Sequence, residues 1–481
     1  MIPVKTIGLN AVLFIFFYSY SPPLGNRRPG VVLPYLKISF SAPIMTEYGE
    51  FWPRLPETIT QNAHEGEPMK QKICLSALLV LGLCLSACSA AFQPTVAPAL
   101  SPLPTYFPKI DAHPQSTNFG RGMLSTMPTY DPNSDQYWQV DLRSYNLSGL
   151  DLSNSLNDLM YADFDTATEW PAAGKMPASF DWQRILDLGK DPGLGIRALH
   201  QQGITGKGIG IAIIDQPLLV NHQEYAGQLR LYEETDDARN QSSSMHGPAV
   251  ASIAVGKTVG VAPAADLYFI ANYMCFTGSM DSVDFSCLAK SVYRIIEINK
   301  LLPADRKIRV LSMSIGWDSS QKGYAEIVAA VQAARDAGIF VVSSSLEQTY
   351  GFKFQALGRE PLADPNQFDS YEPGLFWAKD FYAGDRFTDR LLVPMDSRTT
   401  AGPGGNDQYV FYREGGWSWS IPYLAGMYAL AAQVKPDITP DEFWTQAMKT
   451  GQTIRLKYNG ETIPFGPILD PPALIAALQA K

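Results

Sequence analysis

Short apolar runs that alternate with helix-periodic stretches constrain the fold of this chain more than any other feature. The candidate strands are residues 209–214, 267–271, 308–313 and 339–343. Each run is too short and too continuously apolar for a strand with one face in water, which predicts strands buried on both faces. Between them, residues 288–299 and 325–334 repeat apolar side chains along one helical face. We therefore predict an α/β fold in which helices flank a mostly parallel sheet.

One further helix has sequence signals at both of its ends. Thr439 is a good N-cap, Pro440 suits the first helical position, and Glu442 completes a capping box. Gly451 is expected to end this helix. The sequence thus predicts a helix that starts at Pro440 and stops at Gly451.

Composition and charge exclude several classes of protein. The chain has 481 residues, of which 46% are hydrophobic and 18% charged, so it has enough apolar material for a large core. This argues against a disordered or collagen-like polymer. With 38 basic and 47 acidic residues, the net charge is −9. The chain lacks the basic excess that binding to phosphate backbones normally requires, so we expect no nucleic-acid partner.

A candidate export signal begins at Met69. Two lysines, Lys70 and Lys72, precede an apolar run over residues 73–85, and small residues follow where a peptidase would cut. The run is too short to span a hydrocarbon core of ~30 Å comfortably, which favours a cleaved signal peptide over a membrane anchor. The alternative is a buried core helix.

The end of this signal, Leu85-Ser86-Ala87-Cys88, resembles the lipobox of bacterial lipoproteins. The resemblance implies cleavage before Cys88, attachment of lipid to the Cys88 thiol, and an extracytoplasmic protein anchored to a bacterial membrane. Because a signal peptide is N-terminal, the 68 preceding residues suggest that translation starts at Met69. Removing residues 1–87 leaves 31 basic and 42 acidic residues, a net charge of −11.

Five segments follow from these patterns. They are a doubtful leader (1–68), the signal peptide (69–87), a Pro/Ala-rich tether (88–109), an N-terminal extension (110–195) and the α/β domain (196–481). Proline-rich composition predicts an extended, weakly packed tether. In the extension, Leu142, Leu147 and Leu152 recur every five residues, which faintly resembles pentapeptide repeats. Two or three such units cannot bury a solenoid core, so we predict an irregular loop segment.

Two cysteines, Cys275 and Cys287, remain in the exported part of the chain. In an oxidising compartment they form either one disulfide or two buried thiols, and the sequence alone leaves both alternatives open.

Three polar residues stand where function usually lies in parallel sheets, near the carboxyl ends of strands and the starts of helices. Asp215 directly follows a candidate strand, His246 opens an apolar helix, and Ser418 follows paired glycines at the mouth of another helix. A serine hydroxyl needs a base to take its proton, and that base needs a carboxylate to fix its tautomer and stabilise its cation. The three residues therefore predict a nucleophilic triad, with helix N–H groups near Ser418 as oxyanion donors.

These motifs resemble those of subtilases, the subtilisin-like serine peptidases, over roughly residues 195–450. The matches are the strand into the acid (206–215), His246-Gly247, the Gly-Val-Ala-Pro stretch (260–263), and Gly416-x-Ser418 with Pro422 four residues later. The spacing in the last motif, with Gly416 two residues before and Pro422 four residues after, selects Ser418 over Ser420 as the nucleophile. The resemblance implies a subtilisin-like three-layer fold and catalytic roles for Asp215, His246 and Ser418. It further implies that Ser314, Ile315 and Gly316 belong to a strand that pairs with an extended substrate.

The resemblance fails at the oxyanion position. Glu347 stands where the family places the Asn that donates to the oxyanion, and an ionised carboxylate there would repel the developing charge. Three accounts remain open. Burial protonates Glu347 so that it donates a hydrogen bond, Gln348 or Thr349 replaces it as donor, or the protein is a degenerate peptidase.

We expect a serine endopeptidase that acts on peptide or protein substrates. The alternative is a catalytically impaired subtilase-like lipoprotein that binds peptides without cutting them. A lipase-like esterase is less favoured, because Ser418 is not in a Gly-x-Ser-x-Gly motif. No cofactor is expected, and structural calcium is not indicated.

Overall fold

The computed structural model describes residues 100–117, 120–134, 136–276 and 283–480. The predicted leader, the signal peptide and Cys88 lie outside the described residues. Among the described residues, no helix combines the length and apolar character needed to cross a bilayer.

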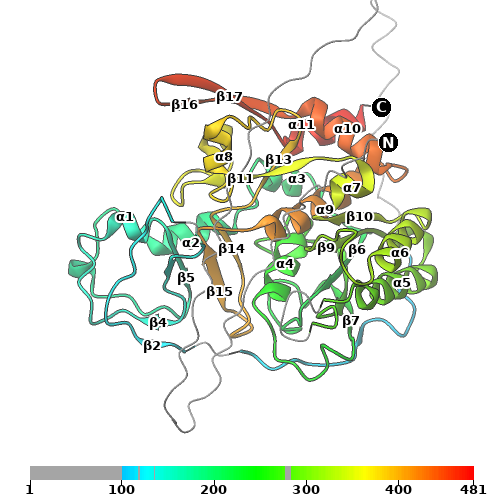
Figure 1. Cartoon of the computed structure of the whole chain (residues 1–481). Helices are drawn as coiled ribbons and strands as arrows, with labels where there is room; N and C mark the ends of the chain where they lie inside the picture. The colour runs from blue at the N-terminus through cyan, green and yellow to red at the C-terminus, as the bar shows by residue number, and fades with distance from the viewer. Residues whose placement is uncertain (1–99, 118–119, 135, 277–282, 481) are drawn as a thin grey trace, which may run out of the picture. The chain divides into compact units, whose positions relative to one another are not determined.

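A parallel six-stranded sheet forms the centre of the α/β domain, as the sequence predicted (Figure 1). Its strands, in spatial order, are β1 (Lys109–Ile110), β7 (Leu229–Glu234), β8 (Asp266–Ala271), β6 (Gly210–Asp215), β9 (Ile308–Met313) and β10 (Phe340–Ser343). All five neighbouring pairs run parallel. Four of the strands coincide with the predicted apolar runs to within one residue at each end, and this confirms the predicted fold class.

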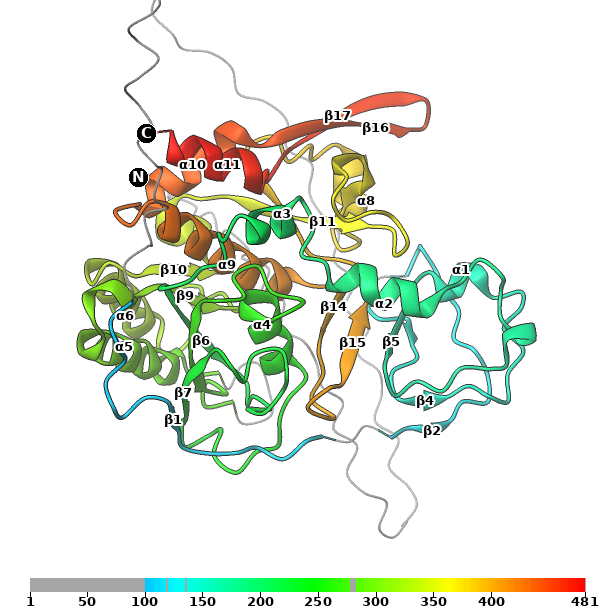
Figure 2. The ribbon, with the colours of Figure 1, turned by 180° about the vertical axis from the view of Figure 1, so that it is seen from behind.

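Helices cover both faces of this sheet (Figures 1 and 2). One face packs on α5 (Phe285–Leu301) and α6 (Tyr324–Asp336), and the other on α4 (His246–Val255) and α9 (Trp417–Val434). Strand β6 shows why two apolar layers are needed. Ala212 and Ile214 face the α5 and α6 side, whereas Ile211 and Ile213 face the α4 and α9 side, because successive residues of a strand point to opposite faces.

Helix α10 (Pro440–Thr450) confirms the predicted N-cap, the proline at the first helical position and the predicted bounds. The Thr439 side chain accepts a hydrogen bond from the backbone N–H of Glu442 at 3.2 Å, and Gly451 follows the last helical residue. Among its described residues, this domain also contains α3 (Ile196–Gln201), α7 (Leu346–Tyr350), α8 (Ala378–Ala383) and α11 (Pro471–Gln479).

A second, mixed sheet lies beyond β10 in the sequence. Its order is β12 (Tyr371–Pro373), β11 (Phe354–Arg359), β13 (Leu391–Pro394), β17 (Glu461–Ile468) and β16 (Gln452–Tyr458). Single-turn 3-10 helices occur at Ala173–Lys175, Ala304–Arg306 and Phe368–Ser370. No sequence pattern predicted this sheet.

The N-terminal extension has short strands and helices joined by irregular chain, so the prediction of an irregular loop holds only for part of it. It contains β2 (Gly122–Met123), β3 (Val140–Asp141), β4 (Tyr145–Asn146), α1 (Leu156–Leu159), β5 (Ala162–Asp165) and α2 (Trp182–Lys190). The pairs β2·β4 and β3·β5 are parallel. Leu142, Leu147 and Leu152 are all buried in one cluster, which Phe411 from a distant strand completes.

That distant strand is β15 (Tyr409–Tyr412), which pairs with β14 (Arg398–Ala401) on one side and with β5 of the extension on the other. The resulting four-stranded sheet, β14-β15-β5-β3, joins the extension to the α/β domain (Figure 1). The extension therefore completes its core with residues of the α/β domain. Two or three five-residue repeats could not bury a core by themselves, but with these added residues they can.

The described part of the predicted tether packs on the α/β domain, contrary to its composition. The Phe107 ring meets Tyr268 edge-on, with the ring centroids 5.7 Å apart. The backbone N–H of Ser101 donates to Asp305 at 2.7 Å, and Lys109 and Ile110 form β1. Phe107 therefore anchors this segment on the α/β domain.

Candidate active site

Asp215 and His246 form a buried hydrogen-bonded pair at the carboxyl edge of the six-stranded sheet. Asp215 is the last residue of β6, and His246 is the first residue of α4. The distance from His246 Nδ1 to Asp215 Oδ1 is 2.7 Å, and the two side chains are 9% and 6% exposed. Since an ionised carboxylate only accepts hydrogen bonds, Nδ1 is the donor of this bond, and in a neutral imidazole this leaves Nε2 as the acceptor.

Backbone groups fix the orientation of this pair. The N–H of Gln216 also donates to Asp215 Oδ1, at 2.8 Å. The hydroxyl of Ser244, a residue that the sequence analysis did not single out, accepts from the N–H groups of His246 (3.2 Å) and Gly247 (3.1 Å). A Cβ at position 247 would collide with the carbonyl oxygen of Gln216, so glycine permits the close approach of α4 to β6.

Ser418 lies in the first turn of α9, an 18-residue helix. Its side chain is buried, its Oγ lies 3.5 Å from the carbonyl oxygen of Ser314, and Ser314 Oγ donates to the Ser418 carbonyl at 3.0 Å. The next residue, Trp419, has its ring centroid 5.4 Å from that of His246. The first turn of α9 therefore lies beside His246 and the end of β9.

The predicted substrate-binding residues lie just beyond a strand. Ser314, Ile315 and Gly316 follow β9, which ends at Met313. The carbonyl of Ile315 accepts from the N–H of Ser344 at 3.0 Å. These three residues thus follow β9 along the chain and lie next to Ser418, but they are not part of β9 itself.

Glu347 does not meet the condition for protonation by burial. It lies in α7, its side chain is 64% exposed, and its carboxylate is 3.7 Å from Lys353 Nζ. Of the two predicted substitutes, Gln348 is exposed and the Thr349 hydroxyl donates within its own helix to the Ser345 carbonyl at 2.9 Å. Backbone N–H groups at the start of α9 are further candidate donors, because the helix dipole there also favours negative charge.

The other histidines of the domain have structural roles. His222 Nε2 lies 2.9 Å from the Gln408 carbonyl, and His200 Nε2 lies 2.8 Å from the Val261 carbonyl. Burial lowers the pKa of both imidazoles, which favours their neutral forms. Neither is the partner of Asp215.

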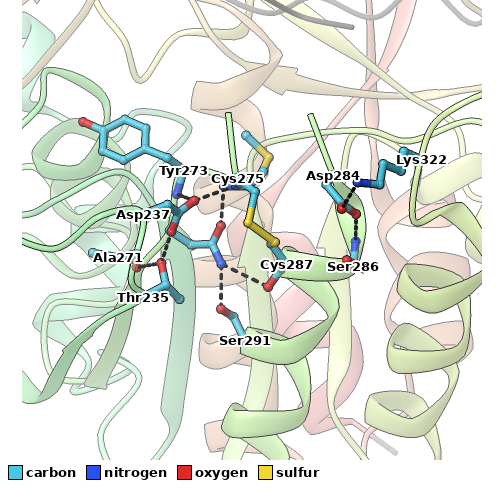
Figure 3. Close-up of a disulfide and its surroundings, with 12 residues drawn as sticks. Thr235, Asp237, Ala271, Tyr273, Cys275, Asp284, Ser286, Cys287, Ser291 and Lys322 are labelled. Atoms are coloured by element: carbon cyan, nitrogen blue, oxygen red, sulfur yellow. Dashed lines mark hydrogen bonds and ion pairs between the residues drawn. A yellow bond between two sulfur atoms is a disulfide. The ribbon is translucent and has the colours of Figure 1, made fainter. Parts of the chain in front are cut away.

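Cys275 and Cys287 form a disulfide that links the segment after β8 to the first turn of α5 (Figure 3). Their Cα atoms are 6.1 Å apart. The carboxylate of Asp237 holds the same segment by accepting from the backbone N–H groups of Tyr273 (3.1 Å) and Cys275 (2.6 Å). Of the two alternatives that the sequence left open, the structure has the disulfide.

Three contacts beside Ser418 were not predicted from the sequence. Trp138 of the extension hydrogen-bonds Glu414, Asp396 accepts from the N–H of Gly415, and the Trp417 indole N–H donates to Gln355 Oε1 at 2.9 Å. Their partners are far apart in the chain, and no local motif signals them. Within the described residues, no cluster of three or more His, Cys, Asp or Glu side chains is arranged to hold a metal ion.

The fold and the site define an α/β protein with a carboxylate–imidazole pair at the carboxyl edge of a parallel sheet. Residues 206–371 match the model of the subtilase family. The chain thus carries a domain that matches subtilase peptidases, and the matched stretch contains Asp215, His246 and Glu347 but ends before Ser418.

Relatives among known proteins are peptidases. The chain is 24% identical over 319 residues to subtilisin-like protease 3 of Arthroderma otae, with 64% of this chain and 76% of that protein covered. It is 26% identical over 308 residues to subtilisin-like protease 3 of Arthroderma benhamiae, with 62% and 73% covered. Among solved structures, the prenylagaramide maturation protease PagA aligns with a TM-score of 0.42 at 16% identity, covering 60% of this chain and 99% of that one.

Proposed function

We propose that this protein is an extracytoplasmic serine endopeptidase that hydrolyses peptide bonds through Asp215, His246 and Ser418. The observation that carries the proposal is the buried hydrogen bond between His246 Nδ1 and Asp215 Oδ1, with Ser418 in the adjacent first turn of α9. The match to a peptidase family supports peptide or protein substrates.

In this mechanism, Ser418 Oγ attacks the carbonyl carbon of the scissile bond while His246 Nε2 takes the hydroxyl proton. Asp215 holds the tautomer that makes this transfer possible and stabilises the imidazolium that results. His246 then gives the proton to the leaving amine, and an acyl-enzyme on Ser418 remains. Water, deprotonated by the same imidazole, hydrolyses the ester and regenerates the serine.

The negative charge that develops on the substrate oxygen needs hydrogen-bond donors. We assign this role to the backbone N–H groups at the start of α9, since the exposed Glu347 carboxylate forms an ion pair with Lys353 instead. The segment Ser314–Gly316, which continues from β9, is the candidate partner for an extended substrate backbone.

We further propose that the protein is anchored to a bacterial membrane by lipid on Cys88. The signal-like segment over residues 69–87 supports this location, and the Cys275–Cys287 disulfide is typical of oxidising compartments. Incorporation of labelled palmitate by the whole chain, and its loss in Cys88→Ser, is the expected result. Equal labelling of the two proteins would contradict the anchor.

The peptidase proposal is tested by labelling the serine with a fluorophosphonate probe. Wild-type protein is expected to label, and Ser418→Ala is expected to lose all labelling, whereas Ser420→Ala serves as the matched control and retains it. Labelling that persists in Ser418→Ala would show that the nucleophile is another residue.

A second candidate function is peptide binding without cleavage. It is favoured by one observation, the absence of the usual amide donor at position 347. In that case the folded wild type would not label, and Glu347→Asn would gain labelling. The endopeptidase proposal instead requires labelling of the wild type.

A further inference from the structure

The N-terminal extension contacts the segment that leads into Ser418. The backbone N–H of Trp138 donates to the carboxylate of Glu414 at 3.0 Å, and the indole N–H of Trp138 donates to the Glu414 carbonyl at 3.1 Å. Glu414 precedes Ser418 by four residues, and Gly415 and Gly416 lie between them. We define residues 413–418 as the nucleophile loop. Trp138 therefore holds both the side chain and the backbone of Glu414, the second residue of this loop.

Aromatic contacts connect the extension to the same loop by a second route. The ring of Tyr137 lies 4.1 Å from that of Phe376, measured between centroids, and the Phe376 and Trp377 rings are 6.2 Å apart. Trp377 in turn lies 5.1 Å from Trp417, the residue before the nucleophile. These four aromatic residues form a continuous row from the extension to Ser418.

A buried carboxylate joins the two routes. Asp396 is 3% exposed, and its two oxygens accept from the backbone N–H groups of Gly415 and Leu375, each at 2.8 Å. Leu375 immediately precedes Phe376 in the aromatic row. The nucleophile loop, the segment around Phe376 and the extension are thus linked as one hydrogen-bonded unit.

The base of the loop is also bound to the extension. Arg413 is fully buried, its backbone N–H donates to Asp163 at 2.7 Å, and its Nε donates to the Met160 carbonyl at 3.1 Å. Its guanidinium lies 5.2 Å from the centroid of the Tyr161 ring. Because β5 pairs with β15 just before this point, the extension fixes the chain on both sides of position 413.

From these contacts we propose that the extension is a permanent part of the active site, in which Trp138 and Glu414 act as positioning residues for Ser418. Two successive glycines give the nucleophile loop more backbone freedom than other residues would, and this freedom must be lost before Ser418 faces His246 reproducibly. Misplacement of a reacting group by ~1 Å can lower a rate by about 10²-fold. The proposal rests on the peptidase function proposed above. It also implies that residues 110–195 stay attached to the α/β domain in the working enzyme.

The test compares two tryptophan variants of the full chain. Trp138→Ala removes the indole and its hydrogen bond to the Glu414 carbonyl, but it keeps the backbone N–H that donates to the Glu414 carboxylate. Trp182→Ala, the matched control, removes a partly buried tryptophan of the same extension that stacks on Trp170 with 6.0 Å between centroids. We expect the two variants to have similar Tm values. Trp138→Ala is nevertheless expected to label with the fluorophosphonate about 10- to 100-fold more slowly than Trp182→Ala. Trp138→Phe also keeps the backbone N–H, but unlike Trp138→Ala it retains an aromatic ring and loses only the indole N–H donor, so a smaller loss of about threefold is expected.

Hydrogen exchange of the Gly415, Gly416 and Trp417 amides provides a readout that does not depend on activity. Exchange should rise in Trp138→Ala and remain at the wild-type level in Trp182→Ala. If wild-type protein fails to label but this exchange pattern is found, the peptidase function fails and the positioning role stands. Labelling and exchange in Trp138→Ala that match those of Trp182→Ala would overturn the positioning role.

Discussion

The six-stranded sheet and the N-terminal extension bury their apolar side chains in different ways. The central strands carry apolar residues on both faces, as Ile211 and Ala212 do in β6, and helices cover both faces. In the extension, three leucines spaced by five residues line a small core that Phe411, more than 250 residues later, helps to complete. The sheet thus combines partners that are near in sequence with α9, which comes much later in the chain, whereas the small core of the extension depends on a strand more than 250 residues away.

The two regions also contribute differently to the candidate active site. The sheet supplies Asp215 and, through its covering helices, His246 and Ser418. The extension supplies none of these side chains but pairs with β15 and contacts Glu414. We therefore expect mutations in the sheet to affect chemistry and mutations in the extension to affect stability and positioning, and the following predictions test this division.

The largest effect is expected from Asp215→Asn, which leaves the packing intact but favours the wrong tautomer of His246. By analogy with serine peptidases, kcat on a peptide substrate should fall by ~10⁴-fold without a matching loss of Tm. Asp336→Asn makes the same chemical change at an exposed position of α6 and serves as the control. A decline in kcat of less than tenfold would exclude Asp215 from the triad.

The next effect is on stability. Leu147 is fully buried in the extension, so Leu147→Ala should lower the free energy of unfolding by about 2–5 kcal/mol, measured by urea denaturation. Leu156→Ala, at a 36% exposed position of α1, should change it by less than about 0.5 kcal/mol. Because the two regions share β15, the variant should unfold in one transition. Separate transitions for the extension and the sheet would contradict the shared core.

A pH dependence should arise where the two regions meet. Burial raises the pKa of Glu414 from 4.5 to about 7 and the pKa of Asp396 from 3.8 to about 6. The folded state therefore binds protons more tightly than the unfolded state, so the stability from these groups is complete below their unfolded pKa values and is lost as pH rises towards 7. Each pKa unit corresponds to ~1.4 kcal/mol, which predicts a loss of about 2 kcal/mol or more.

The groups that act on these two carboxyls are Arg413, Glu372 and the N–H groups of Trp138, Leu375 and Gly415. Urea denaturation at pH 5 and pH 8 measures the loss, and Glu414→Gln should reduce the difference between the two values. An equal difference in wild type and variant would show that Glu414 does not contribute.

The smallest effect is expected at the exposed oxyanion position. Glu347 is paired with Lys353 at the surface, so Glu347→Asn should change the labelling rate by less than about threefold and stability by less than about 1 kcal/mol. A gain of tenfold or more in labelling would instead show that this carboxylate suppresses catalysis. That result would favour the second candidate function, peptide binding without cleavage.

Much of the fold was predictable because its signals are local. Strand β9 and the capping of α10 follow from apolar runs and from Thr439-Pro440, which act within a few residues. Asp215 and His246 were identifiable as candidates because each stands next to a clear element. The exposure of Glu347 was not predictable, since the start of α7 and its contact with Lys353 depend on how the chain turns after β10.

The sequence by itself determined the parallel sheet, the residue types of the candidate triad and the order in which they occur. These features depend on hydrophobic periodicity and on short motifs, and both are properties of neighbouring residues. Only the tertiary structure decided that Leu142, Leu147 and Leu152 share a core with Phe411, and that Trp138 reaches Glu414. Such contacts depend on which distant strands pair, and the free energy of burying an apolar side chain is the same whichever part of the chain covers it.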